Sequence, residues 1–200
     1  MGAANELPRL DHAALLMIDM QWGFIDESSI LCIAGARATI PACARALAEA
    51  RRRGIPIFHV RRRYAADGSD VERVRHALWL AGGRPICAEG DDPRTLEAPP
   101  ELAELPGEHV LVKPSFSAFF RTALHETLQG MGVDTVVLAG TTTPNCVRST
   151  CYDALSYGYD TLVLEDATSS RTPEVQRANI ADMAFIGATV LSVSEFATLP

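Results

Sequence analysis

The stretch that decides the fold is Val133-Asp134-Thr135-Val136-Val137-Leu138-Ala139, followed by Gly140-Thr141-Thr142-Thr143-Pro144-Asn145-Cys146. The first part is an apolar, β-branched run typical of a buried strand. Residues 147–157 have helical character, so Cys146 is expected where a strand turns into a helix. Unpaired N–H groups and the helix dipole lower a thiol pKa there and create a nucleophile. The alternative is that Cys146 is simply a small buried apolar residue.

Apolar runs typical of buried strands alternate along the chain with segments of helical pattern. We expect strands at residues 13–18, 55–60, 109–113, 133–139, 161–164 and 188–193. We expect helices at residues 39–53, 117–131, 147–157 and 173–186, and a shorter one at 71–80. Strands joined through helices require right-handed crossovers. The sequence therefore predicts an α/β fold with a mainly parallel sheet between two layers of helices.

A chain of 200 residues suits one domain, and the strand and helix pattern places its core at residues 13–196. Residues 62–108 form an irregular connection rich in glycine and proline. A connection of that length usually carries function or covers a site, so we expect it to lie near the functional groups.

The composition excludes several classes of function. A net charge of −7 and a pI of about 5.2 argue against nucleic-acid binding, which depends on a basic surface. No apolar run reaches the roughly 18 residues that a membrane span needs. The polar segment 1–11 lacks the apolar region of a signal peptide, and the five cysteines have no regular spacing, so we expect a cytoplasmic protein with reduced thiols. Neither a paired C-x-x-C nor an H-E-x-x-H motif occurs, so no metal or cofactor is expected.

Three chemically active side chains follow three of the expected strands. Asp19 ends the first, Lys113 ends the third, and Cys146 follows the fourth. In open parallel sheets the reactive groups gather beyond the carboxyl ends of the strands. Each residue alone has a simpler interpretation, such as a turn cap or a solvated strand end. Together they predict a catalytic site formed by an acid, a cation and a thiol.

Three segments resemble motifs of the isochorismatase-like cysteine hydrolases. They are Leu16-Met17-Ile18-Asp19-Met20-Gln21-Trp22-Gly23-Phe24, Val112-Lys113-Pro114-Ser115-Phe116-Ser117-Ala118-Phe119, and the stretch from Leu138 to Thr150. That superfamily includes N-carbamoylsarcosine amidohydrolase, ureidoacrylate amidohydrolase, biuret hydrolase and nicotinamidase. The resemblance implies a three-layer α/β/α fold with a six-stranded, Rossmann-like sheet. It also implies a homodimer or homotetramer.

The resemblance further implies an Asp19–Lys113–Cys146 triad. Lys113 would favour the Asp19 carboxylate and the Cys146 thiolate, and Asp19 would move the thiol proton to the leaving nitrogen. Cys146 would attack a carbonyl carbon, release ammonia or an amine, and leave a thioester for water to hydrolyse. A cis peptide bond is implied at Thr141–Thr142. The backbone N–H groups of Thr142 and Cys146 would form the oxyanion hole.

The substrate expected from this resemblance is a small linear amide or carbamoyl compound. Nicotinamidases of the superfamily carry a metal site built on an Asp-x-His pattern, and the segment 60–68 lacks that pattern. Isochorismatase-type vinyl-ether hydrolysis does not need the cysteine, so an intact Cys146 favours amide hydrolysis over that alternative. Arg171 would bind a substrate carboxylate, or else it pairs with a surface acid. The remaining candidate substrate contacts are Phe24, which matches an aromatic of the pocket in relatives, and Phe116 and Phe119, which line the pocket or belong to the core. Arg61 and Tyr64 are weaker candidates.

Overall fold

A single sheet of six parallel strands organises the computed structural model, which describes residues 9–200. The spatial order of the strands is β3-β2-β1-β4-β5-β6. Their bounds are β1 (Ala13–Ile18), β2 (Ile57–Arg62), β3 (His109–Lys113), β4 (Thr135–Thr141), β5 (Asp160–Ser169) and β6 (Thr189–Leu191). This is the six-stranded parallel α/β architecture that the sequence predicts. Residues 1–8 of the polar segment 1–11 lie outside the described residues.

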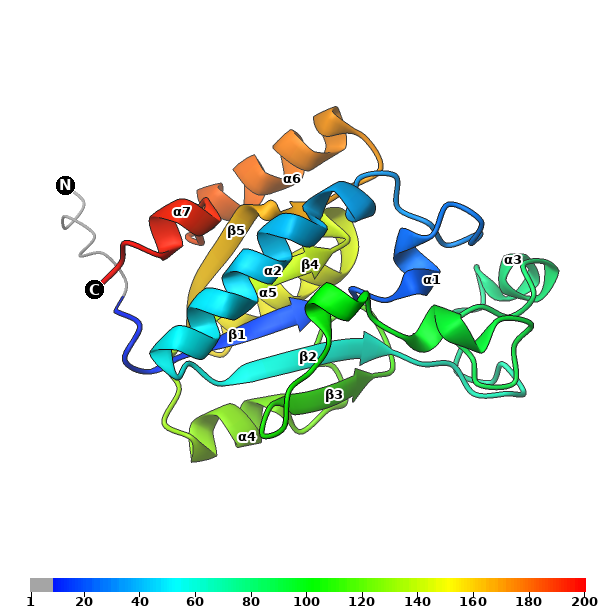
Figure 1. Ribbon diagram of the computed structural model, residues 1–200, viewed down its shortest axis with the longest axis horizontal. Coiled ribbons are helices and arrows are strands. Elements are labelled where there is room, and N and C mark those ends of the chain that lie inside the picture. Colours follow the sequence, from blue (N-terminus) through cyan, green and yellow to red (C-terminus); the bar gives the residue numbers. More distant parts are fainter. Residues whose placement is uncertain (1–8) are drawn as a thin grey trace.

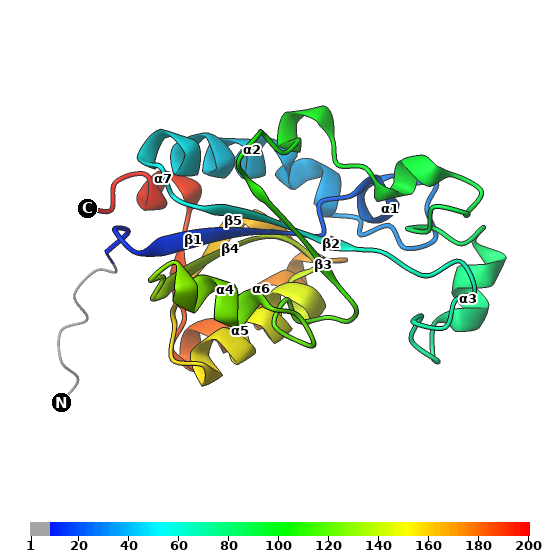
Figure 2. The ribbon, with the colours of Figure 1, turned by 90° about the horizontal axis from the view of Figure 1, so that it is seen from below.

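Two layers of helices cover the sheet (Figures 1 and 2). One face carries α2 and α7, and the other carries α4, α5 and α6. Short helical turns and α1 connect these elements. The bounds are α1 (Trp22–Ile25), α2 (Ala36–Arg53), α3 (His76–Ala81), α4 (Leu124–Gly130), α5 (Arg148–Ser156), α6 (Pro173–Phe185) and α7 (Val193–Phe196), with turns η1 (Pro93–Leu96), η2 (Pro100–Leu102) and η3 (Thr143–Val147).

The central strands are apolar along their whole length because both of their faces are covered. In β1, Leu15 and Met17 belong to the core under α2, whereas Leu16 and Ile18 belong to the core under α4, α5 and α6. Side chains alternate between the faces of a strand, so in a strand buried on both sides no position faces solvent and every position favours an apolar residue. This explains why β1 shows no polar alternation in the sequence.

The prediction of a helix at residues 117–131 is wrong for the first half of that segment. Only Leu124–Gly130 is helical. The backbone N–H of Ala118 donates instead to the Thr150 hydroxyl at 3.0 Å, and Arg121 adopts a left-handed φ of 53°. A side-chain acceptor from a distant helix and a left-handed residue both prevent a continuous helix.

Other boundaries differ from expectation by a few residues. The strand expected at 55–60 begins at Ile57 and continues to Arg62, and the strand expected at 133–139 continues to Thr141. The helix expected at 71–80 is confined to His76–Ala81. The strand expected to run to residue 193 ends at Leu191, because Ser192 caps α7 through a reciprocal pair of hydrogen bonds with Glu195. In β2 and β4 the extension places more of the chain at the carboxyl edge of the sheet.

A buried ion cluster fastens the loop before β3 to α2. Arg51 Nε donates to Glu108 at 2.7 Å, and His59 Nε2 lies 2.8 Å from the same carboxylate. The Leu105 N–H donates to it at 2.9 Å. Burial alone would raise the pKa of Glu108, but these hydrogen bonds lower that pKa to about 2.

The connection between β2 and β3 extends beyond the carboxyl edge of the sheet and carries α3 and η1 (Figure 1). It has a small apolar cluster of its own, separate from the two main cores. We call it the satellite cluster, and its buried members are Tyr64, Val71, Trp79, Ile86 and Cys87. The Trp79 indole donates to the Pro85 carbonyl at 2.9 Å, which satisfies its one polar group. Phe24 and Leu31, from α1 and the loop after it, also pack against this cluster, so the connection is ordered both by its own residues and by that loop.

Among residues 9–200, no helix is both long and apolar enough to cross a lipid bilayer.

Candidate active site

The ends of β1, β3 and β4 bring Asp19, Lys113 and Cys146 together at the carboxyl edge of the sheet. Ile18 pairs with Gly140 between β1 and β4, which places the residues that follow these two strands side by side. Asp19 leaves the strand with a left-handed φ of 51°, an uncommon conformation for a residue other than glycine. Its N–H still donates to the Val60 carbonyl at 2.8 Å, so the end of β1 is fixed against β2.

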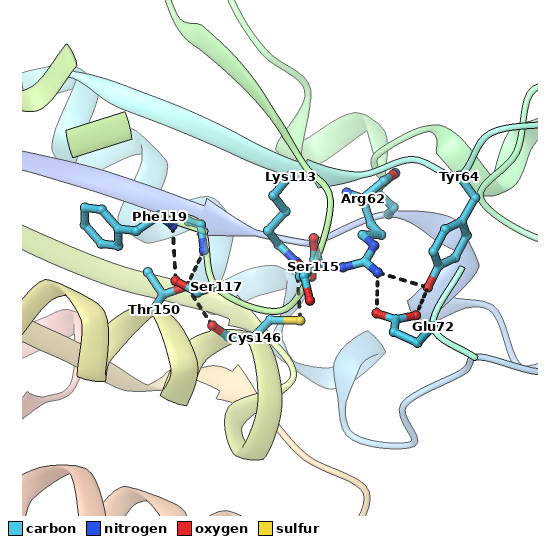
Figure 3. Close-up of polar contacts among 12 residues, drawn as sticks. Arg62, Tyr64, Glu72, Lys113, Ser115, Ser117, Phe119, Cys146 and Thr150 are labelled. Carbon is cyan, nitrogen blue, oxygen red and sulfur yellow. Dashed lines mark hydrogen bonds and ion pairs between the residues drawn. The ribbon is translucent and has the colours of Figure 1, made fainter. Parts of the chain in front are cut away.

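Lys113 is the centre of the arrangement (Figure 3). Its ammonium lies 2.7 Å from Asp19 Oδ2, 3.4 Å from the Cys146 sulfur and 3.0 Å from the Ser115 carbonyl oxygen. These contacts use all three of its hydrogens, and the side chain has no exposed surface. Burial alone would lower the pKa of Lys113, but Asp19 and Cys146 outweigh burial and raise it. Lys113 is therefore a fixed cation between an acid and a thiol.

Cys146 lies in η3, between the end of β4 and the start of α5. The hydroxyl groups of Thr142 and Thr143 both donate to the Ser169 carbonyl, at 3.1 and 2.9 Å. The Ser169 hydroxyl in turn donates to that of Thr141 at 2.9 Å. The three threonines thus tie the turn to the end of β5, and the Thr141–Thr142 peptide bond is cis.

A glycine is required where β4 approaches β1. Gly140 has a φ of 108°, and a Cβ at this position would lie 2.0 Å from the Ile18 carbonyl oxygen. On the other side of the turn, the Thr150 hydroxyl donates to the Cys146 carbonyl at 2.7 Å (Figure 3). The cysteine is therefore held from both ends of the turn.

The expectation that the turn lowers the pKa of Cys146 is wrong. Burial raises the pKa of this thiol to about 12, and the Asp19 carboxylate adds to the effect, while Lys113 acts in the opposite direction. Cys146 lies in the π-helical turn η3, which leads directly into α5 at Arg148. The free site consequently holds a thiol at neutral pH, and a base must remove its proton during a reaction.

Asp19 is suited to accept a proton. The side chain is fully buried, and its ion pair with Lys113 uses Oδ2. Oδ1 has no hydrogen-bond partner among residues 9–200. A buried carboxylate oxygen without a partner is rare in proteins and is typical of sites where chemistry occurs.

A pocket of about 230 Å³ opens over the three residues. Of the aromatic residues expected to contact substrate, Phe24, Tyr64 and Phe116 line it, whereas Phe119 belongs to the core. Thr142 also lines the pocket. Pockets for drug-sized ligands usually measure about 300–1,000 Å³, so this one suits a smaller molecule.

The structure does not bring Arg171 to this pocket. Strand β5 continues to Ser169, and the Ser170 carbonyl accepts a hydrogen bond from the Gly35 N–H at 3.2 Å. This contact turns the following residues toward the start of α2, and exposed Arg171 lines a separate hollow there. Arg61 also lies elsewhere, since its guanidinium pairs with Glu104.

Sequence reasoning missed two cations of the pocket, Arg62 and Arg75. Arg62 was detectable, because strand alternation places residues 62 and 64 on the same face, and Tyr64 was a candidate. Arg75 lies within the helix expected at residues 71–80, but in the structure it immediately precedes α3, so the expected helix did not place its side chain. Cys32, from the loop after α1, also lines the pocket and was likewise not expected there.

The described residues do not form a metal site. No group of three or more His, Cys, Asp or Glu side chains among residues 9–200 lies close enough to hold an ion. The end of β2, where a metal-dependent nicotinamidase carries its Asp-x-His pattern, instead presents Arg62 and Tyr64. These side chains do not supply metal ligands.

A family model described as the isochorismatase domain matches residues 13–195. The chain belongs to the isochorismatase family. Among curated members, a probable inactive nicotinamidase of Arabidopsis thaliana is 37% identical over 94% of this chain and 96% of its own length. The maleamate amidohydrolase of Pseudomonas putida is 35% identical over 85% of this chain and 78% of its own length. A crystal structure of an isochorismatase family protein from Desulfovibrio vulgaris covers 92% of this chain and 96% of its own, with 41% identity and a TM-score of 0.87.

Proposed function

We propose that this chain is a metal-independent cysteine hydrolase that cleaves the C–N bond of a small linear amide or carbamoyl compound. The observation that carries the proposal is the chain of contacts from Asp19 through Lys113 to the Cys146 sulfur, in a buried pocket. An acid, a cation and a thiol in contact are the groups that acyl transfer to sulfur requires.

The first half of the reaction forms a thioester. Asp19 Oδ1 takes the proton of the Cys146 thiol as the sulfur attacks the carbonyl carbon of the substrate. Lys113 stabilises the developing thiolate and holds the carboxylate in place. The negative charge that develops on the substrate oxygen is bound by the backbone N–H groups of Thr142 and Cys146, and one such donor is typically worth about 10²–10³ in turnover. Asp19 then gives its proton to the leaving nitrogen, and ammonia departs.

The second half releases the product. Water attacks the thioester carbonyl while Asp19 accepts a proton from it, and the same backbone donors bind the oxyanion. The C–S bond breaks, the thiolate recovers its proton from Asp19, and a carboxylic acid leaves.

The size of the pocket and the relatives both support a small amide. The maleamate amidohydrolase of Pseudomonas putida is an amidohydrolase by name and shares 35% identity with this chain. The nicotinamidase alternative has less support, since no group of three or more His, Cys, Asp or Glu side chains among residues 9–200 is placed to hold a metal ion. Isochorismatase-type ether hydrolysis would proceed without the thiol. Whether activity requires Cys146 therefore distinguishes amide hydrolysis from ether hydrolysis.

The experiment is ammonia release from a panel of maleamate, N-carbamoyl amino acids, ureidoacrylate, biuret and nicotinamide, with and without a chelator. We expect chelator-resistant release from at least one linear amide, and its loss in Cys146→Ala. The control is Cys151→Ala, a buried cysteine in the same core that makes no contact with Lys113. Turnover retained by Cys146→Ala would refute the role of Cys146 as the nucleophile.

A further inference from the structure

Arg62 is fixed at the carboxyl end of β2, beside two residues of the proposed triad. In the sheet it pairs directly with Lys113 of β3. The side chain of Gln21 brackets its backbone: Nε2 donates to the Arg62 carbonyl at 2.9 Å, and Oε1 accepts from the Arg62 N–H at 2.7 Å. Gln21 itself is buried, and its backbone N–H donates to the Asp19 carbonyl at 2.8 Å. The backbone of Arg62 is therefore held in place relative to Asp19 and Lys113.

The guanidinium of Arg62 is anchored at its far end, through Nη2. Its side chain is 3% exposed, and its contacts with Glu72 and with the Tyr64 hydroxyl all run through that nitrogen (Figure 3). Nε is buried and has no hydrogen-bond partner among residues 9–200. An unpartnered charged donor is costly in a protein interior, so a buried arginine normally satisfies its N–H groups. The Nε–H group therefore has the capacity for one more hydrogen bond.

A second buried atom without a partner complements Nε. Asp19 Oδ1 has no hydrogen-bond partner among residues 9–200, so it does not bond Nε, yet Asp19 and Arg62 line the same pocket. The two groups interact electrostatically: burial alone would lower the pKa of Arg62, whereas Tyr64, Glu72 and Asp19 together raise it. A guanidinium N–H can only donate, and a carboxylate oxygen can only accept. A molecule that bonds both must accept one hydrogen bond and donate another, as water does.

We propose that Arg62 Nε and Asp19 Oδ1 together hold the water molecule that hydrolyses the thioester, so that Arg62 is a catalytic residue of the second half-reaction. The inference rests on the proposed function, because it takes Cys146 as the acylated residue. The water oxygen accepts a hydrogen bond from Nε–H through one lone pair, and one of its hydrogens points to Oδ1. Its second lone pair is left free to attack the thioester carbon, and an oriented nucleophile of this kind lowers the entropic part of the barrier.

The step balances in bonds and protons. A C–O bond forms as one water proton passes to Oδ1, and the negative charge develops on the carbonyl oxygen. The C–S bond then breaks, the proton passes from Asp19 to the Cys146 sulfur, and the product leaves as a carboxylic acid. Arg62 keeps its own proton throughout, because a guanidinium does not deprotonate in a protein. In the first half-reaction Oδ1 serves the thiol and no water takes part. The role of Arg62 is therefore specific to hydrolysis of the acyl-enzyme.

The test uses p-nitrophenyl acetate, an activated ester that acetylates thiols and does not require the natural amide. The acetylated protein is freed of reagent, and loss of the acetyl group from the Cys146 peptide is followed by mass spectrometry in buffer and in hydroxylamine. Hydroxylamine is a strong nucleophile that attacks a thioester without a base. Its rate therefore reports access to the carbonyl carbon, whereas the rate in buffer reports the positioned water.

The proteins compared are the wild type, Arg62→Gln/Glu72→Gln and Glu72→Gln. The double variant removes both charges of the buried pair, which avoids leaving an unpaired carboxylate. Glu72→Gln alone keeps the guanidinium and so isolates the contribution of Arg62. The matched control is Arg61→Gln, which changes the neighbouring arginine, whose side chain pairs with Glu104.

We expect hydrolysis of the acetyl group on Cys146 to slow about tenfold to a hundredfold in the double variant, as loss of one hydrogen bond to a charged group implies. The reaction with hydroxylamine should stay within about threefold of the wild type, because the thioester and the oxyanion hole are unchanged. Glu72→Gln should hydrolyse the acetyl group faster than the double variant, and Arg61→Gln should match the wild type.

Three results would overturn the proposal. They are an unchanged hydrolysis rate in the double variant, an equal loss in hydrolysis and in the hydroxylamine reaction, and a loss of the same size in Glu72→Gln alone. The second of these would mean that Arg62 only supports the pocket. An acetyl group on wild-type Cys146 that is as stable as a small-molecule acetyl thioester would instead overturn the proposed function, and the role of Arg62 with it.

Discussion

Replacing Asp19 by asparagine should separate the reactivity of the Cys146 thiol from catalysis. The Asp19 carboxylate raises the pKa of Cys146, while Lys113 lowers it. Asparagine keeps the shape of the side chain but removes its negative charge and its capacity to accept a proton. Lys113 then acts on the thiol without opposition. The variant should therefore have a more reactive cysteine and yet a slower amide hydrolysis.

The magnitude follows from the contacts of Lys113. Asp19 Oδ2 and the Cys146 sulfur lie 2.7 and 3.4 Å from the same ammonium nitrogen, so they are at most roughly 6 Å apart. Two unit charges at that separation repel by about 3 kcal/mol at an effective dielectric of about 20. Removing this repulsion increases the thiolate fraction roughly a hundredfold. A thiolate of lower pKa is intrinsically less nucleophilic, which leaves a net acceleration of alkylation of about tenfold.

The assay compares iodoacetamide alkylation at pH 8 with single-turnover hydrolysis of the best amide of the panel, in the wild type and in Asp19→Asn. We expect alkylation to rise about tenfold and the acylation rate to fall about 10²–10⁴-fold, the usual contribution of a positioned proton carrier. If both rates fall together in a folded variant, Asp19 only positions Lys113, and the reasoning from its free Oδ1 is refuted.

Three further changes test the framework of the site. Gly140→Ala should lower the free energy of unfolding by about 3 kcal/mol or more, because the Cβ would lie 2.0 Å from the Ile18 carbonyl oxygen. The control is Gly187→Ala, where φ is 113° and the space is open, and it should lower the free energy of unfolding by only about 1 kcal/mol in the same denaturation assay. Thr150→Val should lower the free energy of unfolding by roughly 1–3 kcal/mol, because the Ala118 N–H loses its acceptor. A variant as stable in urea as the wild type would contradict this role of the Thr150 hydroxyl. Glu108→Gln should destabilise the protein by roughly 2–3 kcal/mol at pH 6. The pKa of Glu108 is lowered from 4.5 to about 2, so the stabilisation from its ionised carboxylate is complete above pH 4.5 and is lost as the pH falls through 2. The wild type and Glu108→Gln should therefore become equally stable near pH 2. A difference in their free energies of unfolding that stays constant down to pH 2 would be inconsistent with the ion cluster.

The positions of the proposed triad were accessible from the sequence because each residue follows a strand with a strong apolar signal. Asp19 ends a run that is buried on both faces, Lys113 ends a strand of the expected bounds, and Cys146 follows the most β-branched segment of the chain. Parallel strands align their carboxyl ends, so strand order alone brings these residues to one edge.

The features that could not be predicted from the sequence depend on contacts between segments that are far apart in it. Nothing near Arg171 indicates that the Ser170 carbonyl bonds the Gly35 N–H and turns the chain away from the pocket. The helix expected from residue 117 onward is interrupted by Thr150, which lies 32 residues away from Ala118. The raised pKa of Cys146 reflects three-dimensional burial beside Asp19, whereas the sequence pattern only reported the nearby helix.

The residues proposed to carry out the reaction and some of those that line the pocket around the substrate lie in different parts of the fold, and the satellite cluster belongs to the second part. Asp19, Lys113 and Cys146 lie at or just beyond the ends of strands of the main sheet, whose packing tolerates little change. The pocket wall formed by Tyr64, Arg75 and Leu78 belongs to a connection stabilised largely by its own small core around Trp79. The loop after α1 supplies Ile30, Leu31 and Cys32 to the same wall. Laboratory evolution of a new specificity would therefore best begin in these two segments, which lie outside the sheet.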